Sequence, residues 1–306
     1  MFPPGIPKQV RQQREGNEMN KVVGKIIRTC GYLIGFSVLL YPTVSKYVNT
    51  LHGTSVVSDY QQQVSHTTED MEKQMLEDAR AYNKRLIGTS AGDPFANGIK
   101  KENEEYETLL NPRGDGMMGY IEIPKIKALL PIYHGTTEEV LQSGVGHLES
   151  TSLPVGGEST HAVLSGHRGL TTARLFTDLD QMEEGDVFYI KVLHETLAYQ
   201  VDQILTVLPS ETEALAVTEG ADQVTLVTCT PYMINTHRLL VRGERIPYEE
   251  AVGVAEELDI KPQMPFTQKL LIMGLAAVFL IWVVVTIIRI VRWFRSRKKS
   301  EENDEE

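Results

Sequence analysis

Residues 224–243 read VTLVTCTPYMINTHRLLVRG, and this stretch decides the fold of the central part of the chain. Two runs of β-prone residues, 224–228 and 238–242, flank a segment rich in turn-forming residues. This is the pattern of two antiparallel strands joined by a long, exposed loop. We therefore predict a β-hairpin here.

Two reactive side chains lie at one end of this predicted hairpin. Cys229 leaves the first strand where Arg238 opens the second, and side-chain alternation lets both face one groove. A nearby fixed cation favours the nucleophilic thiolate and can stabilise an oxyanion on an attacked carbonyl. The hairpin alone is equally compatible with an inert buried cysteine beside a surface arginine.

A histidine at a predicted strand end adds a third candidate group. In residues 164–169, LSGHRG, an apolar run gives way to His167 between two glycines. Imidazole is the usual partner of a nucleophilic cysteine because it titrates near neutral pH. Taken alone, such a histidine is also typical of an ordinary surface residue.

Three motifs together carry a family resemblance: THAVLSGHRG at 160–169, TLVTCTPY at 225–232 and NTHRLLVRG at 235–243. In this order they resemble the catalytic signature of the sortases, and their form is similar to class C, the pilin-polymerising group of Gram-positive bacteria. The resemblance covers residues 119–248. It implies an eight-stranded sortase barrel in which His167, Cys229 and Arg238 take the family's catalytic roles.

A second motif lies upstream in residues 88–98, GTSAGDPFANG. Pro94 fixes a turn, so Asp93 and Phe95 are held at a defined offset. From the residues alone this is an exposed turn. Class C sortases carry a lid with an Asp-Pro-aromatic motif, and the resemblance implies that Asp93 pairs with Arg238 while Phe95 covers Cys229.

The composition excludes several functions. The chain of 306 residues has Lys+Arg 30 and Asp+Glu 41, a net charge of −11, so nothing suggests a nucleic-acid binder. Cys30 lies in an apolar segment, which excludes a disulfide with Cys229 and favours a reactive or an inert free thiol.

The remaining histidines do not predict a metal site. None of them has zinc-ligand spacing and no acidic motif accompanies them, so we predict structural or surface roles and neither a metal nor a cofactor. These residues are His134, His147, His161, His194 and His237.

Two apolar stretches predict membrane helices on either side of the globular region. Residues 26–44 follow a basic tail, 1–25, expected to be disordered, and predict a signal anchor, with a cleaved signal peptide as the alternative. Residues 269–290 include LLIMGLAAVFLIWVVVTII and are followed by a basic tail, 291–306. The positive-inside rule then predicts a two-pass plasma-membrane protein with both termini cytoplasmic and the catalytic domain outside.

The residues between these spans predict a helical region followed by a barrel. Residues 45–112 contain amphipathic helices, with a break near 66–69 capped by Thr67 and Asp70, and the lid at 93–95. Residues 113–250 predict a mainly β, closed or nearly closed barrel, and 251–268 a linker. The predicted strands are 120–123, 129–133, 161–165, 187–192 and 197–206 besides the hairpin, and the predicted short helices are 138–143 and 174–182.

The resemblance implies a cysteine transpeptidase. It would cleave an LPXTG-like sorting signal through a thioester acyl-enzyme and join pilin subunits by lysine isopeptide bonds. Its partners would be pilins with C-terminal sorting signals, an acceptor lysine amine or cell-wall amine, and the membrane. The alternatives are a housekeeping sortase that anchors proteins to peptidoglycan and a non-catalytic membrane assembly factor.

Overall fold

A computed structural model of the chain describes residues 8–86, 92–95 and 103–254, together with 274, 279, 282, 285, 286, 288 and 289. The chain divides into two compact units. One comprises residues 1–41 and 263–306, and the other comprises residues 42–262. The second unit contains every predicted site residue.

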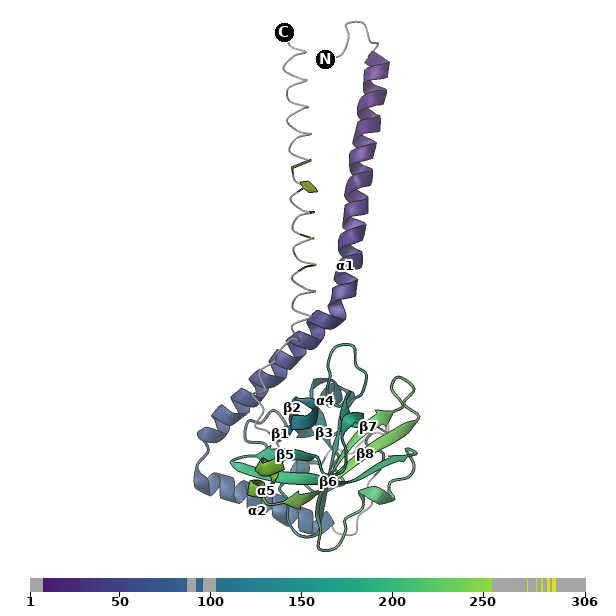
Figure 1. Ribbon diagram of the computed structural model, residues 1–306. Helices are drawn as coiled ribbons and strands as arrows, with labels where there is room; N and C mark the ends of the chain where they lie inside the picture. Colours follow the sequence, from purple (N-terminus) through teal and green to yellow (C-terminus); the bar gives the residue numbers. More distant parts are fainter. Residues whose placement is uncertain are drawn as a thin grey trace. The chain divides into compact units, whose positions relative to one another are not determined.

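Eight strands of the second unit form a closed barrel in the order β1-β2-β3-β4-β7-β8-β6-β5 (Figure 1). Neighbouring strands are antiparallel except for the parallel pairs β2–β3 and β4–β7. The predicted eight-stranded, mainly β fold is therefore confirmed. The strands are β1 (Met117–Ile123), β2 (Ala128–His134), β3 (Val145–His147), β4 (Thr160–Ser165), β5 (Val187–Val192), β6 (Glu195–Val207), β7 (Asp222–Thr230) and β8 (His237–Ile246).

Alternation along β7 decides which side chains face the barrel interior. Val224 and Leu226 belong to the main hydrophobic core. Val227 belongs to a second, smaller cluster with Leu240 of β8. Because successive side chains point to opposite faces, Cys229 shares the face of Val227, on the outside of the barrel.

The predicted strands all lie within observed ones, but two local predictions differ from the structure. β3 was not predicted, because three residues are too few to show a periodicity. The predicted helix 174–182 is wrong: the described residues there form only the 3₁₀ turn η2 (Leu179–Gln181). Leu175 has φ 38°, a left-handed conformation that an α-helix cannot accommodate. The other 3₁₀ turns are η1 (Pro124–Ile126) and η3 (Glu213–Leu215).

Long helices precede the barrel. α1 (Lys8–Ser65) begins within the tail expected to be disordered, so residues 8–25 are helical. α1 ends at the predicted break, and α2 (Glu69–Leu86) follows. The cap is Thr68 rather than Thr67, since its hydroxyl oxygen accepts from the backbone N–H of Met71 at 3.4 Å.

Part of α1 has the character of a membrane anchor. The stretch Val23–Ser65 is long enough to cross a membrane, and its most apolar window has a mean hydropathy of 1.5. The predicted span 269–290 lies mostly outside the described residues. Within the first unit, the ring of Phe279 stacks on Phe36 of α1 with centroids 6.2 Å apart.

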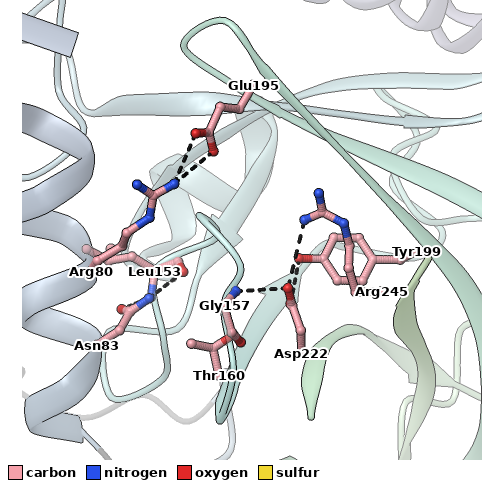
Figure 2. Close-up of polar contacts among 9 residues, drawn as sticks. All are labelled: Arg80, Asn83, Leu153, Gly157, Thr160, Glu195, Tyr199, Asp222 and Arg245. Carbon is pink, nitrogen blue, oxygen red and sulfur yellow. Dashed lines mark hydrogen bonds and ion pairs between the residues drawn. The ribbon is translucent and has the colours of Figure 1, made fainter. Parts of the chain in front are cut away.

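α2 packs against the barrel through both apolar and polar contacts. The side chain of Asn83 is buried, donates to the carbonyl of Leu153 at 3.0 Å and accepts from its N–H at 2.7 Å (Figure 2). Arg80 pairs with Glu195 at 3.0 Å. Three short helices complete the described part of the unit: α3 (Glu104–Thr108) before β1, α4 (Glu138–Ser143) between β2 and β3, and α5 (Tyr248–Val254) after β8. The first residues of the predicted linker 251–268 are therefore helical.

Candidate active site

The β7–β8 ladder brings the candidate nucleophile and cation together. Cys229 and Arg238 are direct partners in the antiparallel register, so their side chains leave the sheet on the same face. The thiol residue is 9% exposed. The predicted hairpin therefore places these two groups side by side.

The parallel pairing of β4 with β7 brings His167 to the same end. Ser165 pairs with Val227, and beyond the strand the N–H of Gly166 donates to the carbonyl of Val227 at 3.1 Å. The hydroxyl of Thr228 donates back to the carbonyl of Gly166 at 2.7 Å. His167 thus leaves β4 beside the end of β7 that carries Cys229.

Arg168 fixes the loop that follows His167, a role that sequence reasoning missed although the residue lies within a quoted motif. Its guanidinium donates to the carbonyl of Thr177 and to the hydroxyl of Thr230, both at 3.2 Å. It also pairs with Asp180 and lies over the ring of Tyr232, 5.8 Å from its centroid. Arg168 therefore links the histidine loop to the end of β7.

The Asp-Pro-Phe segment lies directly on this site. Asp93 accepts two hydrogen bonds from Arg238, from Nε at 2.8 Å and from Nη2 at 2.7 Å. The Phe95 ring lies 5.0 Å from the guanidinium carbon of Arg238 and 5.8 Å from the His167 ring, measured from its centroid. Pro94 between them is buried. The residues proposed from distant motifs thus meet in one place.

The electrostatics of this arrangement favour the neutral thiol. Burial raises the pKa of Cys229, the Arg238 cation lowers it, and the Asp93 carboxylate raises it again. Hydrogen bonding to Asp93 raises the pKa of Arg238. With Asp93 in place, the positive charge beside the sulfur is paired with a carboxylate.

The other histidines have structural contacts. The ring nitrogens of buried His134 contact the carbonyls of Gly116 and Leu109. Buried His161 contacts the carbonyl of Ala216 and the hydroxyl of Thr225, and burial lowers its pKa.

His147 is also buried, and its ring contacts the hydroxyl of Tyr106 and the carbonyl of Ser152. His194 pairs with Glu72 at 2.7 Å, and His237 contacts the hydroxyl of Thr236 at 2.9 Å. These contacts support the predicted structural and surface roles.

A cavity of about 690 Å³ lies at the end of the β7–β8 pair opposite to Cys229. Its lining includes Arg80, Glu195, Asp222 and Arg245. These charges pair with one another across the cavity wall, Arg80 with Glu195 and Arg245 with Asp222. The pair Arg80–Glu195 joins α2 to β6, and the pair Arg245–Asp222 joins β8 to β7.

The sortase domain family matches residues 121–246 of the chain. Sortase D of Bacillus subtilis (strain 168) is 29% identical over 156 residues, which are 49% of this chain and 76% of that protein. The crystal structure of sortase C1 from Streptococcus agalactiae is 49% identical with a TM-score of 0.59, over 63% of this chain and 98% of that one. Sortase C of Streptococcus pneumoniae is 47% identical with a TM-score of 0.60, over 63% and 97%.

The barrel and the match with sortases define a cysteine transpeptidase. The chain belongs to the sortase family and, by its structural neighbours, to class C.

Proposed function

We propose that this chain polymerises pilins, with Cys229 as nucleophile, His167 as acid and base, and Arg238 as oxyanion stabiliser. The observation that carries the proposal is the two-bond contact of Asp93 with Arg238 beside the thiol. It supports a lid of the class C kind, formed by Asp93, Pro94 and Phe95. Sortase C of Streptococcus pneumoniae has been studied for its pilin substrate specificity.

In the first half-reaction the Cys229 thiolate attacks the Thr carbonyl of an LPXTG-like sorting signal near the C-terminus of a pilin. The guanidinium of Arg238 stabilises the negative charge that develops on the carbonyl oxygen. The imidazolium of His167 donates a proton to the leaving glycine amine. The C–N bond breaks and a thioester between the pilin and Cys229 remains.

In the second half-reaction a lysine ε-amine of another pilin attacks the thioester. The amine loses its proton to His167, the thiolate leaves, and an isopeptide bond forms. Exclusion of water from the site distinguishes transfer to an amine from hydrolysis.

The lid must move before the first step. Asp93 occupies two N–H groups of Arg238 that the oxyanion needs, and Phe95 packs against the outer cluster that contains Val227, two residues before Cys229 on the same face. Displacement of the lid frees these donors and exposes the sulfur, as in other gated active sites.

The proposed topology places the barrel outside the plasma membrane. Residues 26–44 form the first span between a cytoplasmic tail, 1–25, and the helical region 45–112. The catalytic barrel, 113–250, and the linker, 251–268, precede a second span, 269–290, and a cytoplasmic tail, 291–306. The apolar helix α1 and the basic residues at both ends of the chain support this arrangement.

Deletion of the protein in its host tests the proposed function by gel analysis of the surface polymer. Loss of a high-mass pilin ladder, restored by the wild-type chain and not by Cys229→Ala, is the expected result. A ladder that persists, with loss of single wall-linked proteins, favours the housekeeping alternative. Restoration by Cys229→Ala favours the non-catalytic assembly factor.

A further inference from the structure

A carboxylate outside the predicted site lies against the candidate catalytic histidine. Glu138, the first residue of α4 (Glu138–Ser143), places Oε2 3.4 Å from Nε2 of His167. Its other oxygen, Oε1, accepts a hydrogen bond from the side-chain amide of Gln142 at 2.9 Å. One carboxylate oxygen is therefore held by the helix while the other faces the imidazole.

The position of Glu138 is fixed by the helix that carries it. Thr137 caps α4, its side chain accepting from the N–H of Val140, and Leu141 anchors the helix with 3% exposure. Gln142 lies one turn after Glu138, which is the spacing at which helical side chains meet. The aim of the carboxylate toward His167 thus follows from the packing of α4.

Within the described part of the chain, the Nε2 atom of His167 lacks a hydrogen bond that could replace the contact with the Glu138 carboxylate. This atom is buried and has no hydrogen-bond partner among the described residues, because the Glu138 contact lies outside hydrogen-bond geometry. The contact is therefore an ion pair that forms when the ring is protonated. The side chains are 20% exposed for His167 and 66% for Glu138, so solvent screens the pair in part.

The other charged groups near His167 are paired with other residues or carry a charge only in one protonation state. The Phe95 ring lies near both the imidazole and the guanidinium of Arg238. Asp93 is hydrogen-bonded to Arg238, and Cys229 contributes a charge only as the thiolate. On the sequence-adjacent side, Arg168 is paired with Asp180.

We propose that Glu138 is a positioning residue that stabilises the imidazolium form of His167 and thereby increases the fraction of the reactive thiolate–imidazolium pair. This inference rests on the proposed catalytic role of His167. The hydrogen bond from Gln142 lowers the pKa of Glu138, and the neighbouring His167 lowers it further, so the carboxylate is ionised at neutral pH.

The proposal links two measurable quantities. Burial raises the pKa of the Cys229 thiol, so the neutral thiol predominates and the thiolate–imidazolium pair is a minor species of the singly protonated site. The acid limb of the rate–pH profile then reports the imidazole and the alkaline limb reports the thiol. Weaker stabilisation of the imidazolium lowers the maximal rate and moves the acid limb to lower pH. Both changes have the same origin, so a roughly threefold lower rate corresponds to a shift of about half a pH unit.

The test is the pH profile of kcat/KM for the full-length chain in detergent, with a sorting-signal peptide and an amine acceptor. For Glu138→Gln we expect a maximal rate about threefold lower and an acid limb about half a pH unit lower, the scale of a partly exposed ion pair. The alkaline limb stays in place. The matched control is Glu139→Gln, an exposed neighbour on the same helix. It should keep the wild-type maximal rate and the wild-type position of the acid limb.

Two further variants sharpen the result. Glu138→Asp keeps the charge and moves the acid limb less than Glu138→Gln does. Gln142→Ala releases the carboxylate and moves the limb in the same direction by a smaller amount. A lower rate with an unmoved acid limb overturns the proposal, since a purely structural defect scales the profile without shifting it, and so does an unchanged profile.

A His167→Asn variant separates this inference from the proposed function. If His167→Asn is inactive while Glu138→Gln resembles the wild type, only the role of Glu138 fails. If His167→Asn remains active, the proposed catalytic mechanism itself fails.

Discussion

The two ends of the β7–β8 pair carry similar charged groups that are held in different ways. At one end, Asp222 accepts hydrogen bonds from the Tyr199 hydroxyl at 3.0 Å and the Gly157 N–H at 2.8 Å, with Arg245 3.8 Å away (Figure 2). At the other end, Arg238 is paired with Asp93, which lies 145 residues earlier in the chain.

The two contacts differ in which parts of the chain supply their groups. The groups around Asp222 come from the barrel strands and their loops, so the contact forms whenever the barrel is folded. Asp93 instead lies in the segment before the barrel, so its contact with Arg238 is not part of the β7–β8 ladder. Variants at the Cys229 end should therefore change chemistry, and variants at the Asp222 end should change stability.

The largest expected effect is at the sulfur. Cys229→Ala should lower transpeptidation by about 10⁴-fold or more, because the covalent intermediate cannot form. Mass spectrometry of the enzyme incubated with a sorting peptide should show no acyl adduct, and urea unfolding should resemble that of the wild type. An acyl adduct on the variant would contradict the assignment of the nucleophile.

Next in size is loss of the cation. Arg238→Ala should lower kcat/KM by about 10²–10³-fold, the effect of removing an oxyanion donor. The matched control is Arg242→Ala, on the same face of β8, where the arginine pairs with Asp202 at 2.6 Å and should change the rate less than about threefold. Equal losses in the two variants would show that strand stability, and not the oxyanion, explains the effect.

At the opposite end, Asp222→Asn should destabilise the fold by about 1–3 kcal/mol, because a charged acceptor of two hydrogen bonds becomes an amide. The free energy of unfolding in urea measures this. Asp202→Asn, at a more exposed carboxylate that accepts from Arg242, serves as the comparison and should change stability by about 1 kcal/mol or less. If Asp222→Asn instead lost activity per folded molecule, the Asp222 end would contribute to the chemistry as well as to stability.

A smaller effect is expected from the lid carboxylate. The Asp93 charge raises the pKa of Cys229, so Asp93→Ala should lower that pKa and increase the thiolate fraction at pH 7–8. The rate of alkylation by iodoacetamide at pH 7–8 should therefore rise, because the thiolate is the reactive form. Above the pKa of Cys229 in both proteins, the thiol is fully ionised in each. The ratio of the two alkylation rates should then reflect only how easily iodoacetamide reaches the sulfur. Asp59→Ala, on the exposed surface of α1, is the control.

The smallest effect is expected at the exposed ion pair of α2, and a buried contact of the same helix serves as the comparison. Arg80→Ala removes a half-exposed ion pair and should reduce stability by about 0.5 kcal/mol in urea unfolding. Asn83→Ala leaves the buried backbone groups of Leu153 without their side-chain partners and should reduce stability by about 1–3 kcal/mol. The reverse order would show that α2 is held mainly by charge.

Much of the barrel was predictable because its signals are local. The runs at 187–192 and 138–143 predicted β5 and α4 with the observed bounds. β3 was missed because three residues are too few to show a periodicity. The sequence of residues 174–182 favours a helix, but the left-handed backbone of Leu175 prevents one. The motifs also predicted His167, Cys229 and Arg238 as site residues, and the structure brings all three to the same end of the barrel.

By itself the sequence determined the reactive groups, the strands that carry them and an apolar N-terminal helix, because these depend on residue identity and on short-range periodicity. The tertiary structure alone decided their environment. It raised the pKa of Cys229, brought Glu138 to His167, and contains the Asp93–Arg238 pair that only the family resemblance had implied. Distance and burial between segments far apart in the chain determine how charges interact, and no local pattern records them.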